Sequence, residues 1–211
     1  MIIAIDGPAA AGKGTLARQI ADHFGYAYLD TGSLYRAVAH AVVKAGKEPG
    51  DEAAALKAAK ELDPAAIDPK AIRTGEIGQA ASIVAAMQPV RDAILAFQRN
   101  FAENPPEGAP GAVLDGRDIG TVVCPEAELK LFVTASPEVR AHRRWLELKN
   151  SGSKVSETQV LEEVRERDKR DRERAHSPLL PAADAHLLDT SDLSIEAAFK
   201  AALAIIESGR T

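Results

Sequence analysis

A loop that could hold phosphate groups lies near the start of the chain. It spans residues 7–15 and reads Gly-Pro-Ala-Ala-Ala-Gly-Lys-Gly-Thr. The pattern Gly-x-x-x-x-Gly-Lys-[Ser/Thr] predicts a backbone that wraps an anion, with Lys13 reaching the outer phosphates and a helix N-terminus facing the ligand. The hydroxyl residue comes one place late, at Thr15, because Gly14 follows the lysine. The residues expected to bind nucleotide phosphates are Gly7, Pro8, Ala9, Ala10, Ala11, Gly12, Lys13, Gly14 and Thr15.

The sequence on both sides of the loop fits this interpretation. Residues 2–5 read Ile-Ile-Ala-Ile and predict a buried strand, and residues 16–20 begin a helical pattern. A strand–helix turn that contains glycines by chance is the alternative. The near-complete motif, placed between a strand and a helix, favours phosphate binding.

Short apolar segments that alternate with helical patterns predict an α/β fold, with a five-stranded parallel sheet covered by helices on both faces. The predicted strands are residues 2–6, 26–30, 112–115, 129–135 and 186–189. The predicted helices are residues 12–24, 32–45, 51–62, 77–101, 137–148 and 194–208. We expect a single domain with a core of residues 1–45, 112–149 and 178–211, a helical insert at 46–111 and a lid at 150–177.

Polar clusters follow four of the five predicted strands. The phosphate loop follows the first strand, and residues 30–32, 115–118 and 189–192 follow the second, third and fifth. Each cluster alone is also typical of a turn or a helix cap. Ligands of open parallel sheets bind outside the carboxyl ends of the strands, so we expect the clusters to share one site. Arg36 and Arg117 follow two of these strand ends and are placed to bind phosphate.

A basic helix is predicted in the lid, where residues 165–174 read Arg-Glu-Arg-Asp-Lys-Arg-Asp-Arg-Glu-Arg. Helical spacing puts Arg167, Arg170, Asp171 and Arg174 on one face. A solvated helix with internal ion pairs has the same composition. Together with the phosphate loop, the pattern favours a lid that closes over phosphates.

Acidic residues at the end of the third strand are candidate Mg²⁺ ligands. Asp115 closes the apolar run of residues 112–114, and we expect it to hold Mg²⁺, directly or through water, with the Thr15 hydroxyl. Asp118 could serve the metal instead, or bind the acceptor. Spacing alone does not decide between these roles.

Composition excludes several classes of protein. The chain has 211 residues, a formal net charge of −5 and one cysteine, so neither a disulfide framework nor a general nucleic-acid binder is expected. No run approaches the length of a membrane span, and no signal-peptide pattern opens the chain. The Asn-Lys-x-Asp motif of guanine-specific switches is absent from the sequence. We expect a cytoplasmic monomer that binds neither nucleic acid nor membrane.

Four motifs together resemble those of the bacterial cytidylate kinases. They are the phosphate loop, Leu-Asp-Thr-Gly-Ser-Leu-Tyr-Arg at 29–36, Asp-Gly-Arg-Asp-Ile-Gly-Thr-Val-Val at 115–123 and Arg-Asp-Lys-Arg-Asp-Arg-Glu-Arg at 167–174. The segment Pro-Leu-Leu-Pro-Ala-Ala-Asp-Ala at 178–185 adds to the likeness, which covers nearly the whole chain. The resemblance implies transfer of a phosphoryl group from ATP, with Mg²⁺, to CMP or dCMP.

The resemblance also implies roles for residues that contact the acceptor nucleoside. Ser82, Arg91 and Asp118 would face the cytosine, and Arg167 and Asp171 would contact the ribose. A carboxylate accepts a hydrogen bond from the exocyclic amine of cytosine, where uracil presents a carbonyl. Asp118 would therefore favour cytosine over uracil.

A second implied set surrounds the phosphates. Arg36, Arg117 and Arg174 would bind the acceptor phosphate, and Arg170 would lie near the transferring phosphoryl group. The catalytic cations would be Lys13, Arg117, Arg170 and Arg174, acting by charge stabilisation rather than covalent chemistry. The remaining expected contacts to CMP are Thr31 and Tyr35.

The chain departs from the family in its insert. Relatives usually carry a small antiparallel sheet there, whereas residues 62–64 lead almost directly to residues 72–76 here. Thr31 stands where many relatives have serine, which preserves a hydroxyl. A kinase of another small acceptor, such as UMP, AMP or a hydroxy acid, is the alternative.

Overall fold

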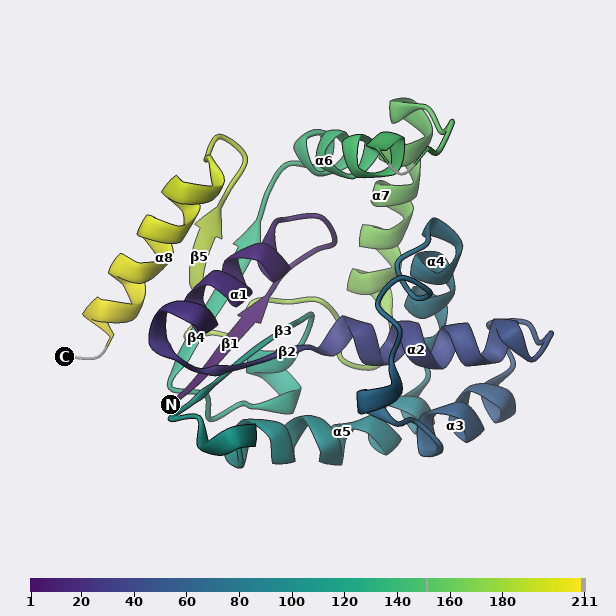
Figure 1. The fold of residues 1–211 in the computed structure, drawn as a ribbon. Helices are drawn as coiled ribbons and strands as arrows, with labels where there is room; N and C mark the ends of the chain where they lie inside the picture. Colours follow the sequence, from purple (N-terminus) through teal and green to yellow (C-terminus); the bar gives the residue numbers. More distant parts are fainter. Residues whose placement is uncertain (151, 210–211) are drawn as a thin grey trace.

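A five-stranded parallel sheet forms the centre of the computed structural model, which describes residues 1–150 and 152–209 (Figure 1). Its strands follow the order β2-β3-β1-β4-β5, and all neighbouring pairs are parallel. The strands are β1 Ile2–Asp6, β2 Ala27–Asp30, β3 Ala112–Gly116, β4 Leu129–Thr134 and β5 His186–Asp189. The prediction of a five-stranded parallel sheet is confirmed.

Helices connect and cover these strands. The α-helices are α1 Lys13–Phe24, α2 Thr31–Lys44, α3 Glu52–Lys60, α4 Gly75–Val84, α5 Gln88–Glu103, α6 Pro137–Asn150, α7 Glu157–Glu173 and α8 Ile195–Ser208. Shorter helical turns are η1 Pro64–Ala66, η2 Pro106–Gly108 and the π-helical turn η3 Ile119–Val123. In Figure 1, α6 and α7 (green) project beyond one end of the sheet, and α2, α3 and α4 (blue) lie to its side.

Alternating strand residues pack against two different layers of helices. Ile3, Ile5 and Val113 belong to a buried cluster with α1 and α8. Ala4 and Leu114 point to the opposite face and pack with residues of α5 and η3. Both faces of the central strands are therefore buried, which explains why these strands are almost continuously apolar.

The predicted helix over residues 77–101 is wrong, because the segment forms two helices. α4 ends at Val84 and α5 begins at Gln88, and the two helical segments are bent by 99° relative to one another. Pro89 lies in the first turn of α5, where its missing N–H costs nothing. A proline in the middle of a helix would have removed a hydrogen bond and clashed with the preceding turn, so the chain breaks there.

The insert has its own buried cluster, formed by α2, α3, α4 and α5. Leu34, Val38, Ala55, Val84 and Ile94 belong to it. Within the described residues, no strand occurs between positions 46 and 111. The cluster fixes α4 beside α2, and α4 in turn contacts α7.

No single helix of the described residues is long and apolar enough to cross a membrane, although the bent pair α4–α5 passes on length and composition when its members are counted together.

Candidate active site

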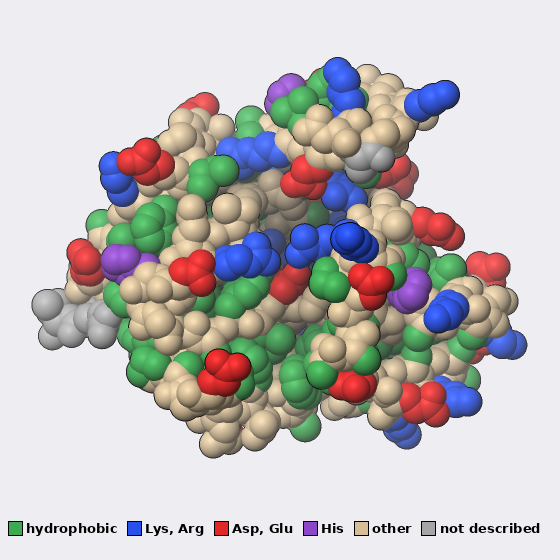
Figure 2. Space-filling model, viewed as in Figure 1, with side chains coloured by type: hydrophobic (Ala, Val, Ile, Leu, Met, Phe, Trp, Pro, Cys, Tyr) green, Lys and Arg blue, Asp and Glu red, His purple; other side chains and the backbone are tan. Residues whose placement is uncertain are grey.

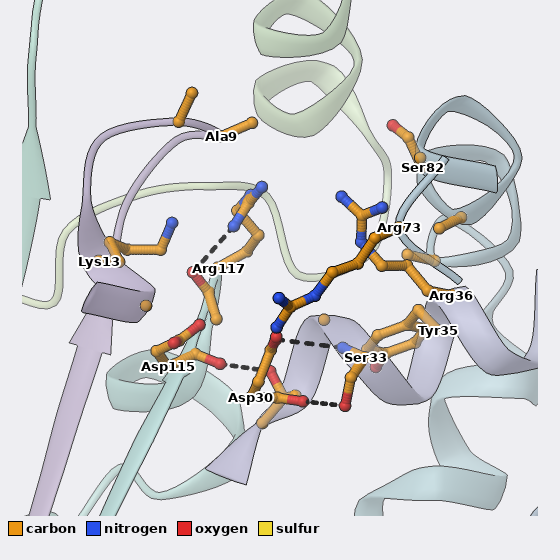
Figure 3. Close-up of a pocket in the computed structure, with 18 of the residues that line it drawn as sticks. Ala9, Lys13, Asp30, Ser33, Tyr35, Arg36, Arg73, Ser82, Asp115 and Arg117 are labelled. Carbon is orange, nitrogen blue, oxygen red and sulfur yellow. Dashed lines mark hydrogen bonds between the residues drawn. The ribbon is translucent and has the colours of Figure 1, made fainter. Parts of the chain in front are cut away.

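A cleft of about 700 Å³ opens at the carboxyl ends of the strands. Figure 2 shows Lys and Arg side chains gathered in the hollow across this face, and Figure 3 shows the side chains that enter it from several elements. The cleft is lined by most residues that were predicted to bind nucleotide or metal: Ala9, Ala10, Gly12, Lys13, Gly14, Thr15, Thr31, Tyr35, Arg36, Ser82, Arg91, Asp115, Arg117, Asp118, Arg167, Asp171 and Arg174.

The phosphate loop presents free backbone donors to the cleft. Gly12 has a φ of 87° and caps α1 without any side-chain hydrogen bond, so the first amides of α1 stay available to an anion. Ala10 also has a positive φ of 59°. Gly7 has a φ of 146°, and a Cβ there would lie 1.9 Å from the carbonyl oxygen of Val133. The loop therefore requires glycine at position 7 for close contact with β4 as well as for its turn.

Lys13 lies at the bottom of the cleft and is only 6% exposed. Its Nζ donates a hydrogen bond of 2.9 Å to the carbonyl oxygen of Pro8. Burial and the nearby charge of Arg117 lower the pKa of Lys13 to about 7. An anion in the cleft would favour the protonated form of this ammonium group.

Two carboxylates meet at the ends of neighbouring strands. Asp30 of β2 pairs in register with Asp115 of β3. Tyr28 donates a 2.6 Å hydrogen bond to Asp115 Oδ2. Burial and the charge of Asp30 raise the pKa of Asp115 to about 6. Asp30 also caps α2 by accepting a hydrogen bond from the Ser33 amide at 3.1 Å.

The carboxylates of Asp30 and Asp115 fit Mg²⁺ better than they fit a cation that takes all of its ligands from the protein. Among residues 1–150 and 152–209, no group of three or more His, Cys, Asp or Glu residues could hold a metal ion. Mg²⁺ in phosphate-transfer sites takes one or two carboxylates and completes its shell with water and substrate phosphates. Asp115 and Asp30 supply such carboxylates, and Thr15 is exposed on the first turn of α1.

A buried ion pair lies on the insert side of the cleft. Arg91 donates through Nη2 to Asp118 Oδ2, and both side chains are under a tenth exposed. Arg91 also donates to the Ala85 carbonyl at 3.1 Å, and its guanidinium lies 5.5 Å from the centre of the Tyr35 ring. Arg174 approaches the other oxygen of Asp118 at 3.8 Å. These four contacts fix the Asp118 carboxylate beside the Arg91 guanidinium, and we call this part of the cleft the Arg91–Asp118 recess.

Asp171 of α7 connects the lid helix to α4 and to the segment after β3. It accepts a 3.0 Å hydrogen bond from Arg117 Nε and a 3.4 Å hydrogen bond from the Ser82 hydroxyl. Arg167 Nε lies 4.0 Å from the same carboxylate. Burial opposes ionisation of Asp171, but Arg117 and Arg167 outweigh it and hold its pKa below the usual value.

In the part of the chain that the structure describes, three arginines of the lid segment have a buried donor atom without a hydrogen-bond partner, and two of them, Arg167 and Arg174, line the cleft. Arg167 Nε and Arg174 Nη2 are buried and have no hydrogen-bond partner among the described residues. Burial lowers the pKa of Arg167 to about 9, with a contribution from the charge of Arg117. Buried donors without partners are rare in proteins, so they indicate room for an acceptor such as a phosphate or a ribose hydroxyl.

A family model described as cytidylate kinase matches residues 3–208. The chain belongs to the cytidylate kinase family. A cytidylate kinase of Rhodospirillum rubrum is 61% identical over 206 residues, which cover 98% of this chain and 97% of the relative. A cytidylate kinase of Azorhizobium caulinodans is 58% identical over 210 residues, covering 100% of both chains. The crystal structure of an uncharacterized protein from Eubacterium ventriosum shares the fold, with a TM-score of 0.55 and 16% identity over 99% of this chain and 98% of that one.

In this cytidylate kinase family member, four of the predicted residues do not line the cleft. Gly7, Pro8 and Ala11 belong to the phosphate loop but are not part of the lining. Arg170 is not part of the lining either, and its Nη2 donates a 2.5 Å hydrogen bond to Gln79 of α4, which does line the cleft. In this conformation, Arg170 therefore joins the lid helix to the insert.

Other residues at this cytidylate kinase cleft were missed. Arg73 and Arg144 line it, and Figure 3 shows Arg73 beside Arg36. Asp6 accepts hydrogen bonds from the Ile119 and Gly120 amides at 2.7 and 2.8 Å, which anchors η3 directly after Asp118. Asp6 could have been predicted from the sequence, because it is an acidic residue at the end of the first strand. Arg73 and Arg144 lie near other basic residues, and no pattern distinguishes them.

Proposed function

We propose that this protein transfers the γ-phosphoryl group of ATP to CMP or dCMP, which gives ADP and CDP or dCDP. Membership of the cytidylate kinase family supports the reaction. The observation that carries the proposal is that one cleft is lined both by the phosphate loop and by the buried Arg91–Asp118 pair. A candidate donor phosphate site and a candidate polar recess for a base thus belong to the same cleft.

The Arg91–Asp118 recess supports cytosine as the acceptor base. We assign Asp118 to accept from the exocyclic amine, and Arg91 and Ser82 to donate to the ring nitrogen and carbonyl, because all three line the cleft and Arg91 contacts Asp118. Uracil would put a carbonyl against the carboxylate and leave buried polar groups unpaired. Sites that depend on buried hydrogen bonds reject the mismatched analogue strongly.

The cations around the middle of the cleft support phosphoryl transfer. We assign Arg36, Arg117 and Arg174 to the acceptor phosphate, and Arg167 with Asp171 to the ribose. Positioning and charge stabilisation account for most of the catalysis of such transfers. The acceptor is an anionic phosphate oxygen, so direct in-line attack needs neither a covalent enzyme intermediate nor a general base.

The metal assignment is Mg²⁺ held by Asp115 and Thr15, with Asp30 beside them. When bound, Mg²⁺ would neutralise charge on the donor phosphates. Lys13 and the loop amides would bind the same phosphates from the other side. Arg170 would reach the transferring phosphoryl group only after it leaves Gln79, and lid closure would then exclude water.

The test is coupled ADP production with CMP, dCMP, UMP and AMP offered in parallel, with ATP and Mg²⁺. CMP and dCMP should be used fastest. Asp118→Asn should lower kcat/KM for CMP by about 100-fold, because a buried charged hydrogen bond is lost. Asp22→Asn is the matched control, since Asp22 is exposed. Faster turnover of UMP or AMP would support the alternative acceptor and contradict this proposal.

A further inference from the structure

Arg140, on the first turns of α6, is 1% exposed and is the largest fully buried side chain among the described residues. Its Nε donates to the Ala135 carbonyl at 2.8 Å, and its Nη1 donates to the Ala9 carbonyl at 3.2 Å. The same guanidinium forms two parallel bonds to Asp168 of α7, at 2.9 and 2.5 Å. One side chain therefore joins the phosphate loop, the end of β4 and the lid helix.

The contact to Ala9 bears on a strained part of the phosphate loop. The Ala9 carbonyl belongs to the peptide that precedes Ala10, and Ala10 has a φ of 59°. A left-handed conformation is unfavourable for a residue with a Cβ and persists only where surrounding contacts hold it. Alternation of right- and left-handed residues turns successive amides toward one point and so forms an anion-binding concavity. Arg140 thus supports the backbone geometry that makes the loop able to bind phosphate.

The contact to Asp168 bears on the arginines of the lid helix. Asp168 is 5% exposed and lies on α7 between Arg167 and Asp171, both of which line the cleft. A bidentate guanidinium–carboxylate pair fixes both distance and orientation, which a lysine cannot reproduce. Because both partners are buried, loss of either one leaves an uncompensated charge.

A second ion pair joins the same two helices on the surface. Arg165 of α7 contacts Glu138 of α6 at 2.8 Å, and the two side chains are 58% and 59% exposed. Exposed pairs of this kind contribute little, because water and salt screen them. The Arg140–Asp168 pair is thus buried and reaches the phosphate loop, whereas the Arg165–Glu138 pair is exposed and only links α6 to α7.

We propose that Arg140 and Asp168 form a positioning clamp that sets the lid arginines relative to the phosphate loop. Arg140 is a positioning residue, since it acts through the Ala9 peptide and through Asp168 rather than on the nucleotides. The clamp fixes the position of the phosphate loop relative to the α7 side chains, so that the donor and acceptor phosphates are aligned for transfer. The inference rests on the proposed phosphoryl transfer and adds a residue pair to which that proposal gives no role.

The test uses variants that keep the charges and change the geometry. Arg140→Lys and Asp168→Glu are compared with wild type for kcat, KM for each nucleotide and melting temperature, and Arg165→Lys is the matched control. Misplacement of reacting groups by about 1 Å can cost about 100-fold, so kcat per folded molecule should fall by about that factor in both clamp variants. KM for CMP should also rise, because the lid arginines are assigned to CMP, but by less than kcat falls, and Arg165→Lys should stay within about twofold of wild type for both.

The Ala10→Gly substitution tests the loop half of the clamp. Glycine adopts a positive φ without support. In the Arg140→Lys background, Ala10→Gly should therefore restore part of the lost kcat and part of the ATP affinity measured by calorimetry. Absence of any recovery contradicts the role assigned to the Ala9 contact.

The remaining outcomes decide the proposal as a whole. If kcat per folded molecule stays within about threefold of wild type in both clamp variants, the pair is only structural and the proposal is overturned. If Arg140→Lys fails to fold, Asp168→Glu decides, because it leaves the Arg140 contacts to Ala9 and Ala135 in place. The acceptor is chosen beforehand from the wild-type substrate panel, so failure of CMP as a substrate is read separately from failure of the clamp.

Discussion

The Tyr28 hydroxyl donates a 2.6 Å hydrogen bond to Oδ2 of Asp115, across the neighbouring strands β2 and β3. The contact holds in place the carboxylate that we assign to Mg²⁺. Burial and the charge of Asp30 raise the pKa of Asp115 to about 6, and the hydrogen bond from Tyr28 opposes that rise. The tyrosine therefore both orients the carboxylate and keeps it ionised near neutral pH.

Tyr28→Phe should raise the Mg²⁺ concentration needed for half-maximal activity by about tenfold or more, since a hydrogen bond to a charged group contributes about 1.5–3 kcal/mol. Without the phenol, the pKa of Asp115 moves above about 6, so the defect should be largest at acidic pH and fade as pH rises. Magnesium titrations at several pH values measure this effect. Tyr26→Phe is the control, because the Tyr26 hydroxyl donates a hydrogen bond, within the part of the chain that the structure describes, only to the Met1 sulfur, at 3.6 Å. Equal behaviour of the two variants would contradict the role assigned to Tyr28.

Lys13 should take up a proton when ATP binds. Its pKa in the free protein is lowered to about 7 by burial and by Arg117, so the amine is increasingly neutral above that pH. Bound phosphates favour the ammonium form, so the apparent Kd for ATP should rise with pH, by at most about tenfold per pH unit. Calorimetry in two buffers of different ionisation enthalpy measures the uptake. Binding heats that do not depend on the buffer above pH of about 7 would refute this prediction.

Lys13→Ala supplies the matching kinetic test. The variant should lose proton uptake and at least about 100-fold in kcat, as expected when a preorganised charge is removed from the transferring group. The fold should remain, because the Lys13 side chain donates a hydrogen bond only to the Pro8 carbonyl among the described residues, and its burial costs solvation. Circular dichroism checks the fold. Near-normal turnover of a folded Lys13→Ala protein is incompatible with the proposed mechanism.

The arginines assigned to the acceptor phosphate should discriminate between the two nucleotides. Arg36→Met and Arg174→Met should each raise KM for CMP by about 10-fold to 100-fold, the worth of a charged hydrogen bond, and change KM for ATP by less than about threefold. Arg172→Met is the control, since Arg172 lies in the last turn of α7, two residues before Arg174, and is exposed. Steady-state kinetics with each substrate varied in turn measures the split. Equal effects on KM for both nucleotides would contradict the assignment of Arg36 and Arg174 to the acceptor site.

Local features explain why much of the site could be predicted from the sequence. The phosphate loop is one continuous segment, and glycine occupies two of its three positions with a positive φ, Gly7 and Gly12. Asp30 and Asp115 end consecutive members of a parallel sheet, so their proximity follows from topology once the strands are recognised. The roles of Ser82 and Arg91 came only from the family resemblance, because both residues lie on helices without a distinguishing pattern.

The missed features depend on contacts between distant segments. Arg140 and Asp168 are 28 residues apart, and both occur in segments rich in charge, where one buried pair looks like any solvated pair. The break between α4 and α5 had a local signal in Pro89, which the strong helical periodicity on either side outweighed in the prediction. The contact of Arg170 with Gln79 depends on how α7 sits against α4, which no local pattern encodes.

Two glycines of the phosphate loop should differ sharply in their tolerance of a methyl group. At Gly7 the φ is 146° and a Cβ would lie 1.9 Å from the Val133 carbonyl oxygen, whereas at Gly12 the φ is 87° and no atom lies within 4 Å of a Cβ. Gly12→Ala should therefore lower the free energy of unfolding by about 1 kcal/mol, the strain of the backbone alone. Gly7→Ala should lower it by more than about 3 kcal/mol, because β1 and β4 must also separate to admit the methyl group. Urea unfolding followed by circular dichroism measures both, and similar losses in the two variants would show that the loop does not press against β4 as the structure has it.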